Sequence, residues 1–139
     1  MAQDKRSRKL KRLVTVQRHM EKMAEVTLAD TTRQRAEVAD SMDSILGALS
    51  SMDPVHHQFS KMYSERFGRL TVKDRQLAGA QQLQEMAVLK EKTKGDRLQD
   101  KMYEARDDED RETDDNAIYD LLEIMNATPA PASSKVRDT

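Results

Sequence analysis

The stretch SSMDP, residues 50–54, decides the fold because it separates two long helical patterns. Asp is favoured at the N-cap of a helix, where its carboxylate accepts a hydrogen bond from an unpaired backbone N–H. Pro is favoured at the first helical position because the N–H that it lacks would have no partner there. Asp53-Pro54 therefore predicts that a second helix begins directly after a first one ends near Met52. Such a chain folds back on itself and makes a rod.

Before this break, apolar residues recur every three or four positions from about Leu10 to Met52, as on one face of a helix. The stripe comprises Leu13, Val16, Met20, Ala24, Leu28, Thr31, Arg35, Val38, Met42, Ile45, Leu49 and Met52. Its three successive steps of four from Val16 to Leu28 predict a stutter, which locally unwinds a coiled coil. Thr31 and Arg35 make the stripe thin between residues 30 and 44.

After the break, a second stripe extends from about Phe59 to Ala105. It comprises Phe59, Tyr63, Phe67, Leu70, Leu77, Ala80, Leu83, Ala87, Leu98, Met102 and Ala105, with a polar gap at Lys73 and Asp74. Two such stripes predict an all-α fold, a long antiparallel two-helix coiled-coil hairpin over residues 1–110.

Charge is segregated along the chain although the formal net charge is only −1. Residues 4–22 carry eight basic and two acidic residues, whereas residues 104–115 carry eight acidic and two basic ones. A fold-back at Asp53 pairs residue i with residue 107 − i and brings these segments together. The parallel alternative would place like charges side by side, so the charge pattern favours the antiparallel hairpin.

Composition excludes several classes of protein. Apolar residues make up 37% of the chain and charged residues 35%, and there is no Trp or Cys. This suits a narrow helix–helix seam better than a thick core, and it excludes a disulfide framework. No apolar run approaches the roughly 20 residues that span a bilayer. The sequence has no phosphate-binding loop, nucleophile elbow or HExxH motif, so we expect no enzyme, catalytic residue, cofactor or small-molecule ligand. The adjacent His56 and His57 do not share a helix face, so we expect no metal site.

The C-terminal part has three predicted pieces. The acidic block DDEDRETDD, residues 107–115, leads into an acidic linker and a short amphipathic helix over residues 111–126, and residues 127–139 form a disordered tail. Ile118, Leu121, Leu122 and Met125 recur at i, i+3, i+4 and i+7 and predict one apolar face. This face either packs back on the hairpin or docks in the groove of a partner.

The basic run at the start of the chain, Lys5, Arg6, Arg8, Lys9 and Arg12, has three interpretations. It is a solvated helix start beside the chain's own acidic segment, a contact surface for a protein partner, or a nucleic-acid site. Because no aromatic residue is interleaved for base stacking, we expect no nucleic-acid partner. These five residues and the apolar face at 118–125 are the predicted protein-binding residues.

The segment KLKRLVTVQRHMEKMAEVTLAD, residues 9–30, resembles the opening helix of the FliJ family. The matching residues are Leu10, Leu13, Val14, Gln17, Arg18, Glu21, Ala24, Leu28 and Ala29. FliJ is a coiled-coil protein of the bacterial flagellar export apparatus, with stalk-forming relatives in type III secretion systems. The resemblance covers about residues 5–105 and implies a stalk or escort protein that contacts an export ATPase and the membrane export gate. It implies a cytoplasmic protein, or one held at the inner membrane through partners. The acidic block and the apolar face at 118–125 fall outside it.

Two other functions remain open at this point. A generic coiled-coil adaptor or dimerisation module, unrelated to export, fits the same stripes. A nucleic-acid-binding protein with a basic arm is the more distant alternative, and salt-dependent retention on DNA would favour it.

Overall fold

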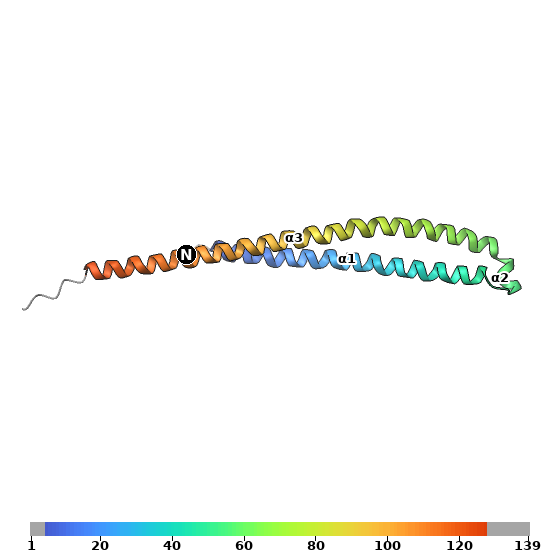
Figure 1. The fold of residues 1–139 in the computed structure, drawn as a ribbon, viewed down its shortest axis with the longest axis horizontal. Coiled ribbons are helices and arrows are strands. Elements are labelled where there is room, and N and C mark those ends of the chain that lie inside the picture. Colours follow the sequence, from blue (N-terminus) through green and yellow to red (C-terminus); the bar gives the residue numbers. More distant parts are fainter. Residues whose placement is uncertain (1–4, 128–139) are drawn as a thin grey trace, which may run out of the picture.

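The computed structural model describes residues 5–127, which form one long hairpin (Figure 1). Helix α1 spans Arg6–Leu49, the short helix α2 spans Pro54–Gln58, and helix α3 spans Ser60–Ala127. Helices α1 and α3 run antiparallel and pack against each other, and α2 lies at the closed end. The predicted all-α fold is confirmed, since residues 5–127 contain no strand.

Local capping chemistry begins α2 at the predicted residue. Asp53 Oδ1 accepts a hydrogen bond from the Val55 N–H at 3.0 Å, and Pro54 occupies the first turn. The length of this helix differs from the prediction: it has five residues, and the long helix begins only at Ser60. The connection between α1 and α3 is therefore the whole segment 50–59 rather than a direct restart.

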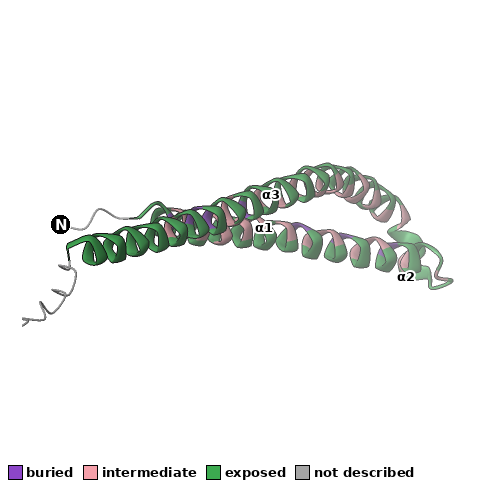
Figure 2. Ribbon diagram, turned by 60° about the vertical axis from the view of Figure 1, so that its left-hand side comes forward, coloured by how far each residue is buried: buried purple, intermediate pink, exposed green. Residues whose placement is uncertain are grey.

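Most of the buried and half-buried residues on α1 follow an unbroken heptad repeat, with steps that alternate between three and four. Those on the repeat are Ser7, Leu10, Val14, Gln17, Glu21, Ala24, Leu28, Thr31, Arg35, Val38, Met42 and Ile45. On α3 the same alternation passes through Ser60, Tyr63, Phe67, Leu70, Asp74, Leu77, Gln81, Gln84, Val88, Glu91, Gly95, Leu98, Met102, Ala105 and Glu109. We call these two facing stripes the seam (Figure 2). Sustained heptad spacing is the pattern of a coiled coil, which confirms the predicted coiled-coil hairpin.

The predicted α1 stripe is correct from residue 24 to residue 45 but wrong nearer the start of the helix. Leu13, Val16 and Met20 are 52%, 58% and 47% exposed. The residue that follows each of them in the sequence is the one that lies in the seam. The predicted stutter is therefore absent, because the true stripe keeps its heptad spacing through this segment.

The α3 stripe contains the same kind of error. Leu83 is 70% exposed and Ala87 is also exposed, while the residues after them, Gln84 and Val88, are half-buried. In both helices the sequence carries a second apolar stripe one residue out of frame with the seam. The prediction places the more apolar stripe in the seam. In the structure, the seam contains the stripe that keeps the heptad spacing along the whole rod.

The fold-back is centred up to about five residues later than predicted. The midpoint between hydrogen-bonded partners is residue 58 for Ser7 with Glu109 and for Arg35 with Gln81, but residue 54 for Gln17 with Glu91. The predicted rule of 107 − i would have placed residue 100 opposite Ser7. The shift arises because the segment 50–59 forms its own short helix and does not turn tightly at Pro54.

The C-terminal part of α3 also departs from the prediction. No linker or separate short helix forms at 111–126, because α3 continues through the acidic block to Ala127. No Gly or Pro interrupts residues 96–128, so nothing in the backbone ends the helix there. Residues 110–127 extend past the start of α1 and are all exposed (Figures 1 and 2). We call this segment the overhang. Residues 128–139 of the predicted tail lie outside the described residues.

Candidate interaction surfaces

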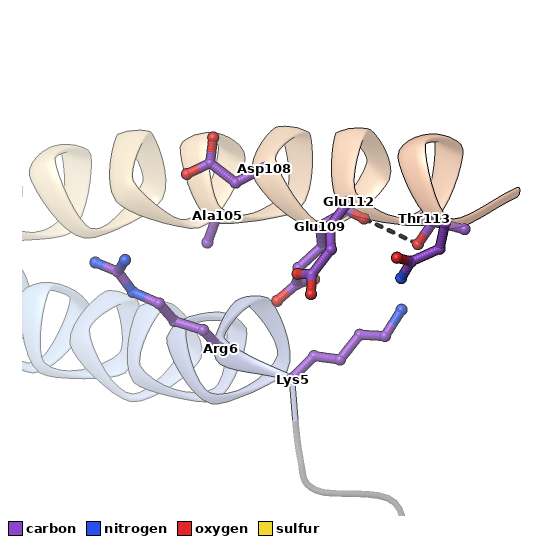
Figure 3. Close-up of a pocket in the computed structure, with 8 residues that line it drawn as sticks. Lys5, Arg6, Ala105, Asp108, Glu109, Glu112 and Thr113 are labelled. Atoms are coloured by element: carbon purple, nitrogen blue, oxygen red, sulfur yellow. Dashed lines mark hydrogen bonds between the residues drawn. The ribbon is translucent and has the colours of Figure 1, made fainter. Parts of the chain in front are cut away.

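The predicted basic surface lies where α1 begins, beside the acidic part of α3. Its members Lys5, Arg6, Arg8, Lys9 and Arg12 are all exposed. Figure 3 shows Lys5 and Arg6 across from Asp108, Glu109 and Glu112, with which they line an open hollow. The hairpin thus brings the basic and acidic segments together as predicted. The contact is loose, because Lys5 and Arg6 form no ion pair within residues 5–127.

A serine, rather than a basic residue, fixes this end of the seam. The Ser7 backbone N–H donates to Glu109 Oε1 at 2.9 Å, and the Ser7 hydroxyl donates to Glu109 Oε2. These two hydrogen bonds stabilise the carboxylate and lower the pKa of Glu109 below the ordinary value of 4.5. The N–H of a first-turn residue has no partner within its own helix, so Glu109 satisfies it from the facing helix.

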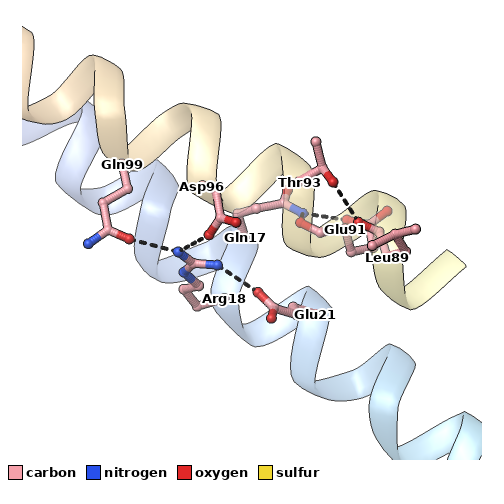
Figure 4. Close-up of polar contacts among 8 residues, drawn as sticks. All are labelled: Gln17, Arg18, Glu21, Leu89, Glu91, Thr93, Asp96 and Gln99. Atoms are coloured by element: carbon pink, nitrogen blue, oxygen red, sulfur yellow. Dashed lines mark hydrogen bonds and ion pairs between the residues drawn. The ribbon is translucent and has the colours of Figure 1, made fainter.

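The seam is polar around Arg18, which forms a cluster that joins the two helices (Figure 4). Its Nη2 donates to Asp96 Oδ1 at 2.8 Å and to Gln99 Oε1 at 2.7 Å. Its Nη1 donates to Glu21 Oε2 at 2.9 Å on the same helix. The hydrogen bonds to Asp96 and Glu21 raise the pKa of Arg18 further, so the guanidinium stays charged.

Gly95 makes room for this cluster. A Cβ atom at Gly95 would lie only 2.7 Å from Arg18 Nη1, closer than atoms of these types approach one another. The other glycines of α3, Gly68 and Gly79, have no neighbouring atom within 4 Å of the same position. Gly95 is therefore the one glycine of α3 whose missing side chain is used by the facing helix.

A second polar contact lies one turn along the seam. Gln17 Nε2 donates to the backbone oxygen of Glu91 at 3.1 Å and also to its carboxylate (Figure 4). The side-chain hydrogen bond from Gln17 lowers the pKa of Glu91. Together with the contacts of Arg18, this hydrogen bond sets residues 17 and 18 of α1 level with residues 91–99 of α3.

Arg35 and Asp74, which the sequence marks as interruptions in two separate stripes, are partners. Arg35 Nε lies 3.1 Å from Asp74 Oδ1, and Arg35 Nη1 donates to Gln81 Oε1 at 3.0 Å. The guanidinium thus spans two seam positions of α3 that are one heptad apart. The two gaps compensate each other, so this part of the seam is held by polar contacts and not left weak.

The predicted apolar face on the overhang is present and uncovered. Its members Ile118, Leu121, Leu122 and Met125 are between 48% and 69% exposed. The structure therefore does not pack this face back on the hairpin. It is available to a partner, whereas the seam is occupied.

A second exposed apolar surface was missed in the prediction because its residues were assigned to the seam. Leu13, Val16, Met20 and Met23 advance by three, four and three along α1 and are between 47% and 59% exposed. The spacing that suggested a buried stripe instead makes an outward-facing one. The signal that could have separated the two stripes is the unbroken heptad running from Ser7 to Ile45.

Two further predictions are that the chain has no metal site and no apolar run long enough to span a bilayer. Within residues 5–127 there is no group of three or more His, Asp or Glu residues that could hold a metal ion. His56 instead contacts Tyr63, with 3.1 Å between Nδ1 and the phenol oxygen. None of the described helices has a stretch both long and apolar enough to cross a bilayer.

Comparison with known proteins leaves the family open. No protein-family model, curated protein or solved structure matches the chain.

Proposed function

We propose that the chain acts without catalysis as a coiled-coil stalk or escort protein of a bacterial flagellar or type III export apparatus. In this role a hairpin would couple or scaffold an export ATPase and the membrane export gate. The proposal rests on the hairpin geometry together with the resemblance of residues 9–30 to the opening helix of the FliJ family.

The observation that carries the proposal is the shape of the molecule. At about 1.5 Å per residue, the 44 residues of α1 extend over about 66 Å and the 68 residues of α3 over about 102 Å. A paired rod of this length transmits position between two bodies that bind its ends. The closed end and the basic start of α1 are separated by the full length of α1.

Two exposed surfaces would serve such a scaffold. The basic residues of α1, among them Lys5 and Arg8, suit an acidic surface on a partner, because complementary charges guide association. The apolar face of the overhang suits a groove that accepts one amphipathic helix. We propose a cytoplasmic location, or one at the inner membrane that depends on these partners.

The test uses the purified full chain and the export ATPase from the same genome. The chain alone should hydrolyse no ATP, yet it should bind that ATPase or change its turnover. The variant Arg6→Glu, Arg8→Glu, Lys9→Glu should weaken the binding, while the matched variant Lys61→Glu, Arg69→Glu, Arg75→Glu should not. Properly folded chain that binds neither the ATPase nor the export gate would refute the export proposal.

A generic coiled-coil adaptor or dimerisation module is the second candidate. The exposed apolar face of the overhang favours it, because this face lies outside the part of the chain that resembles the FliJ family. A gene location away from export ATPase or flagellar basal-body genes would support this alternative.

A further inference from the structure

The overhang combines an apolar face with many acidic residues. Ser7 contacts Glu109, so the paired part of α3 ends there and residues 110–127 continue alone for about 27 Å. Ile118, Leu121, Leu122 and Met125 form its apolar face. The overhang also contains six acidic residues and one basic residue. A docking site for this segment must therefore offer apolar side chains bordered by positive charge.

The hairpin itself carries a surface of that description, which we call the basic flank. On α1 it consists of Leu13, Val16, Met20 and Met23, and on α3 of Lys94, Arg97 and Lys101. The apolar members are all exposed. Lys94 lies 3.4 Å from Glu91, and Arg97 and Lys101 form no ion pair within residues 5–127.

Two hollows between the helices show that these residues share one side. In the half of the hairpin nearer the closed end, Gln34 of α1 and Lys73 of α3 line one hollow. Near the open end, Arg6 of α1 and Asp108 of α3 line another. On α1, multiples of seven residues separate Leu13 and Met20 from residues 6 and 34. On α3, multiples of seven residues separate Lys94 and Lys101 from residues 73 and 108. An unbroken heptad repeat keeps all of them on the same side of the seam.

The polar contacts of the seam show that the α1 and α3 residues of the basic flank lie at the same position along the rod. Gln17 bonds to Glu91 and Arg18 bonds to Asp96. The apolar residues 13–23 therefore lie beside residues of α3 in the range 90–101. An amphipathic helix placed along this flank would set its apolar side on α1 and bring its acidic residues near the cations of α3.

We propose that the overhang of a second copy of this chain docks on the basic flank, and that two copies do so reciprocally. Residues 118–125 lie nine to sixteen positions beyond Glu109, and residues 94–101 lie eight to fifteen positions before it. A two-fold axis at the level of Glu109 therefore superposes the overhang of each copy on the flank of the other. This is an isologous contact, made twice by one symmetry operation.

The same axis brings the acidic blocks 107–115 of the two copies level with each other. It also sets the basic start of each α1, at Lys5 to Arg12, opposite the acidic block of the other copy. The alternative in which two overhangs pair directly would bring two helices of net charge −5 together, and like charges oppose that arrangement. Charge thus selects the flank, rather than the other overhang, as the docking surface. The inference does not depend on the export proposal, since it concerns the purified chain alone.

The first experiment measures the mass of the full chain by sedimentation equilibrium over a range of concentrations. We expect a monomer–dimer equilibrium. The overhang variant Leu121→Ser, Leu122→Ser and the flank variant Val16→Ser, Met20→Ser should each weaken the dimer by at least tenfold. The matched control Met62→Ser, Val72→Ser removes two apolar side chains of similar exposure elsewhere on α3 and should leave the dimer unchanged.

Mixing the two variants tests whether the two surfaces contact each other. The overhang variant keeps an intact flank, and the flank variant keeps an intact overhang, so the mixture should form a heterodimer with one of the two contacts. If the overhang and the flank did not contact each other, the two variants would not associate on mixing. This result would overturn the proposal.

The lack of cysteine permits a direct measurement of proximity. Chains carrying Arg97→Cys and chains carrying Asp120→Cys should form a mixed disulfide when oxidised together. His57→Cys, at the closed end, replaces Arg97→Cys as the control and should give none. A chain that stays monomeric at all concentrations overturns the proposal. If Leu121→Ser, Leu122→Ser then also lowers its melting temperature, the overhang packs on its own hairpin.

Discussion

The paired and unpaired parts of α3 place opposite kinds of residue in opposite environments. Within the hairpin, Gln84 and Glu91 are half-buried against α1, whereas Ile118 and Leu121 in the overhang are mostly exposed. Burial along this helix is thus set by whether a partner helix is present, not by how apolar the residue is. A coiled coil that accepts polar seam residues gains less stability from burial and depends more on matched hydrogen bonds.

The largest expected contrast is between one isoleucine on each side of this boundary. Ile45 is 6% exposed in the seam, and Ile118 is 56% exposed in the overhang. Ile45→Ala should destabilise the hairpin by about 2–5 kcal/mol, because buried methyl groups are lost and a cavity is left. Ile118→Ala should leave unfolding of the monomer unchanged. Denaturant unfolding monitored by circular dichroism checks both, and equal effects would mean that the overhang packs on the hairpin.

The next contrast concerns the polar pair in the seam. Replacing both partners, Arg35→Leu with Asp74→Leu, should stabilise the hairpin by about 1–3 kcal/mol, because two apolar side chains would face each other there. Arg35→Leu alone should instead lower the stability, since it leaves the half-buried Asp74 and Gln81 without their partner. Thermal unfolding of the two variants decides. If the single variant were as stable as the double, Arg35 and Asp74 would not be coupled.

A smaller effect is expected from alanine substitutions at two glycines of α3, of which Gly95 faces Arg18 and Gly68 faces open space. Gly68→Ala should stabilise the hairpin by about 1 kcal/mol, because Ala favours the helix and nothing occupies the space that its Cβ fills. Gly95→Ala should gain less, since the new Cβ must displace the Arg18 guanidinium. In an Arg18→Ala background both substitutions should give the same gain. A full gain from Gly95→Ala in the native background would contradict the role of Arg18.

The smallest expected effect is the pH dependence of the open end. The folded-state pKa of Glu109 lies below the ordinary value of 4.5, so its hydrogen bonds with Ser7 stabilise the fold above that pH. This contribution is lost as the pH falls through the folded pKa. Ser7→Ala should therefore lower the melting temperature slightly at pH 7, and by progressively less as the pH falls below 4.5. The same loss at every pH would show that the carboxylate charge plays no part.

Some features could be predicted from local sequence because their physical cause is local. The hydrogen bond from Asp53 to the Val55 N–H and the fixed backbone of Pro54 act within one turn of helix. The seam between Ala24 and Ile45 was also predicted correctly, since only one stripe there has a regular spacing. The apolar face of the overhang was found for the same reason, although the linker before it was wrong.

Other features could not be predicted because two stripes of the sequence satisfied the same rule. At the start of α1 the more apolar stripe, which includes Leu13 and Val16, was chosen, whereas the facing helix buries the polar Gln17 and Glu21. Apolarity was a misleading criterion there because Gln17 finds its hydrogen-bonding partner Glu91 only in the folded hairpin, while Glu21 bonds Arg18 of its own helix. The pairing of Arg35 with Asp74 was missed for the same reason, since 39 residues separate them along the chain.

The sequence by itself determined that the described residues are helical, where α2 begins, and that opposite charges gather at the open end. Helix propensity, capping and charge act over a few residues or through the net charge of a segment, so they can be read without a partner. Only the tertiary structure decided the register, centred between residues 54 and 58, the heptad frame that is buried, and the length of α3 left over beyond Glu109. These depend on how two long helices align, and a ten-residue connection and the sum of many seam contacts fix that alignment together.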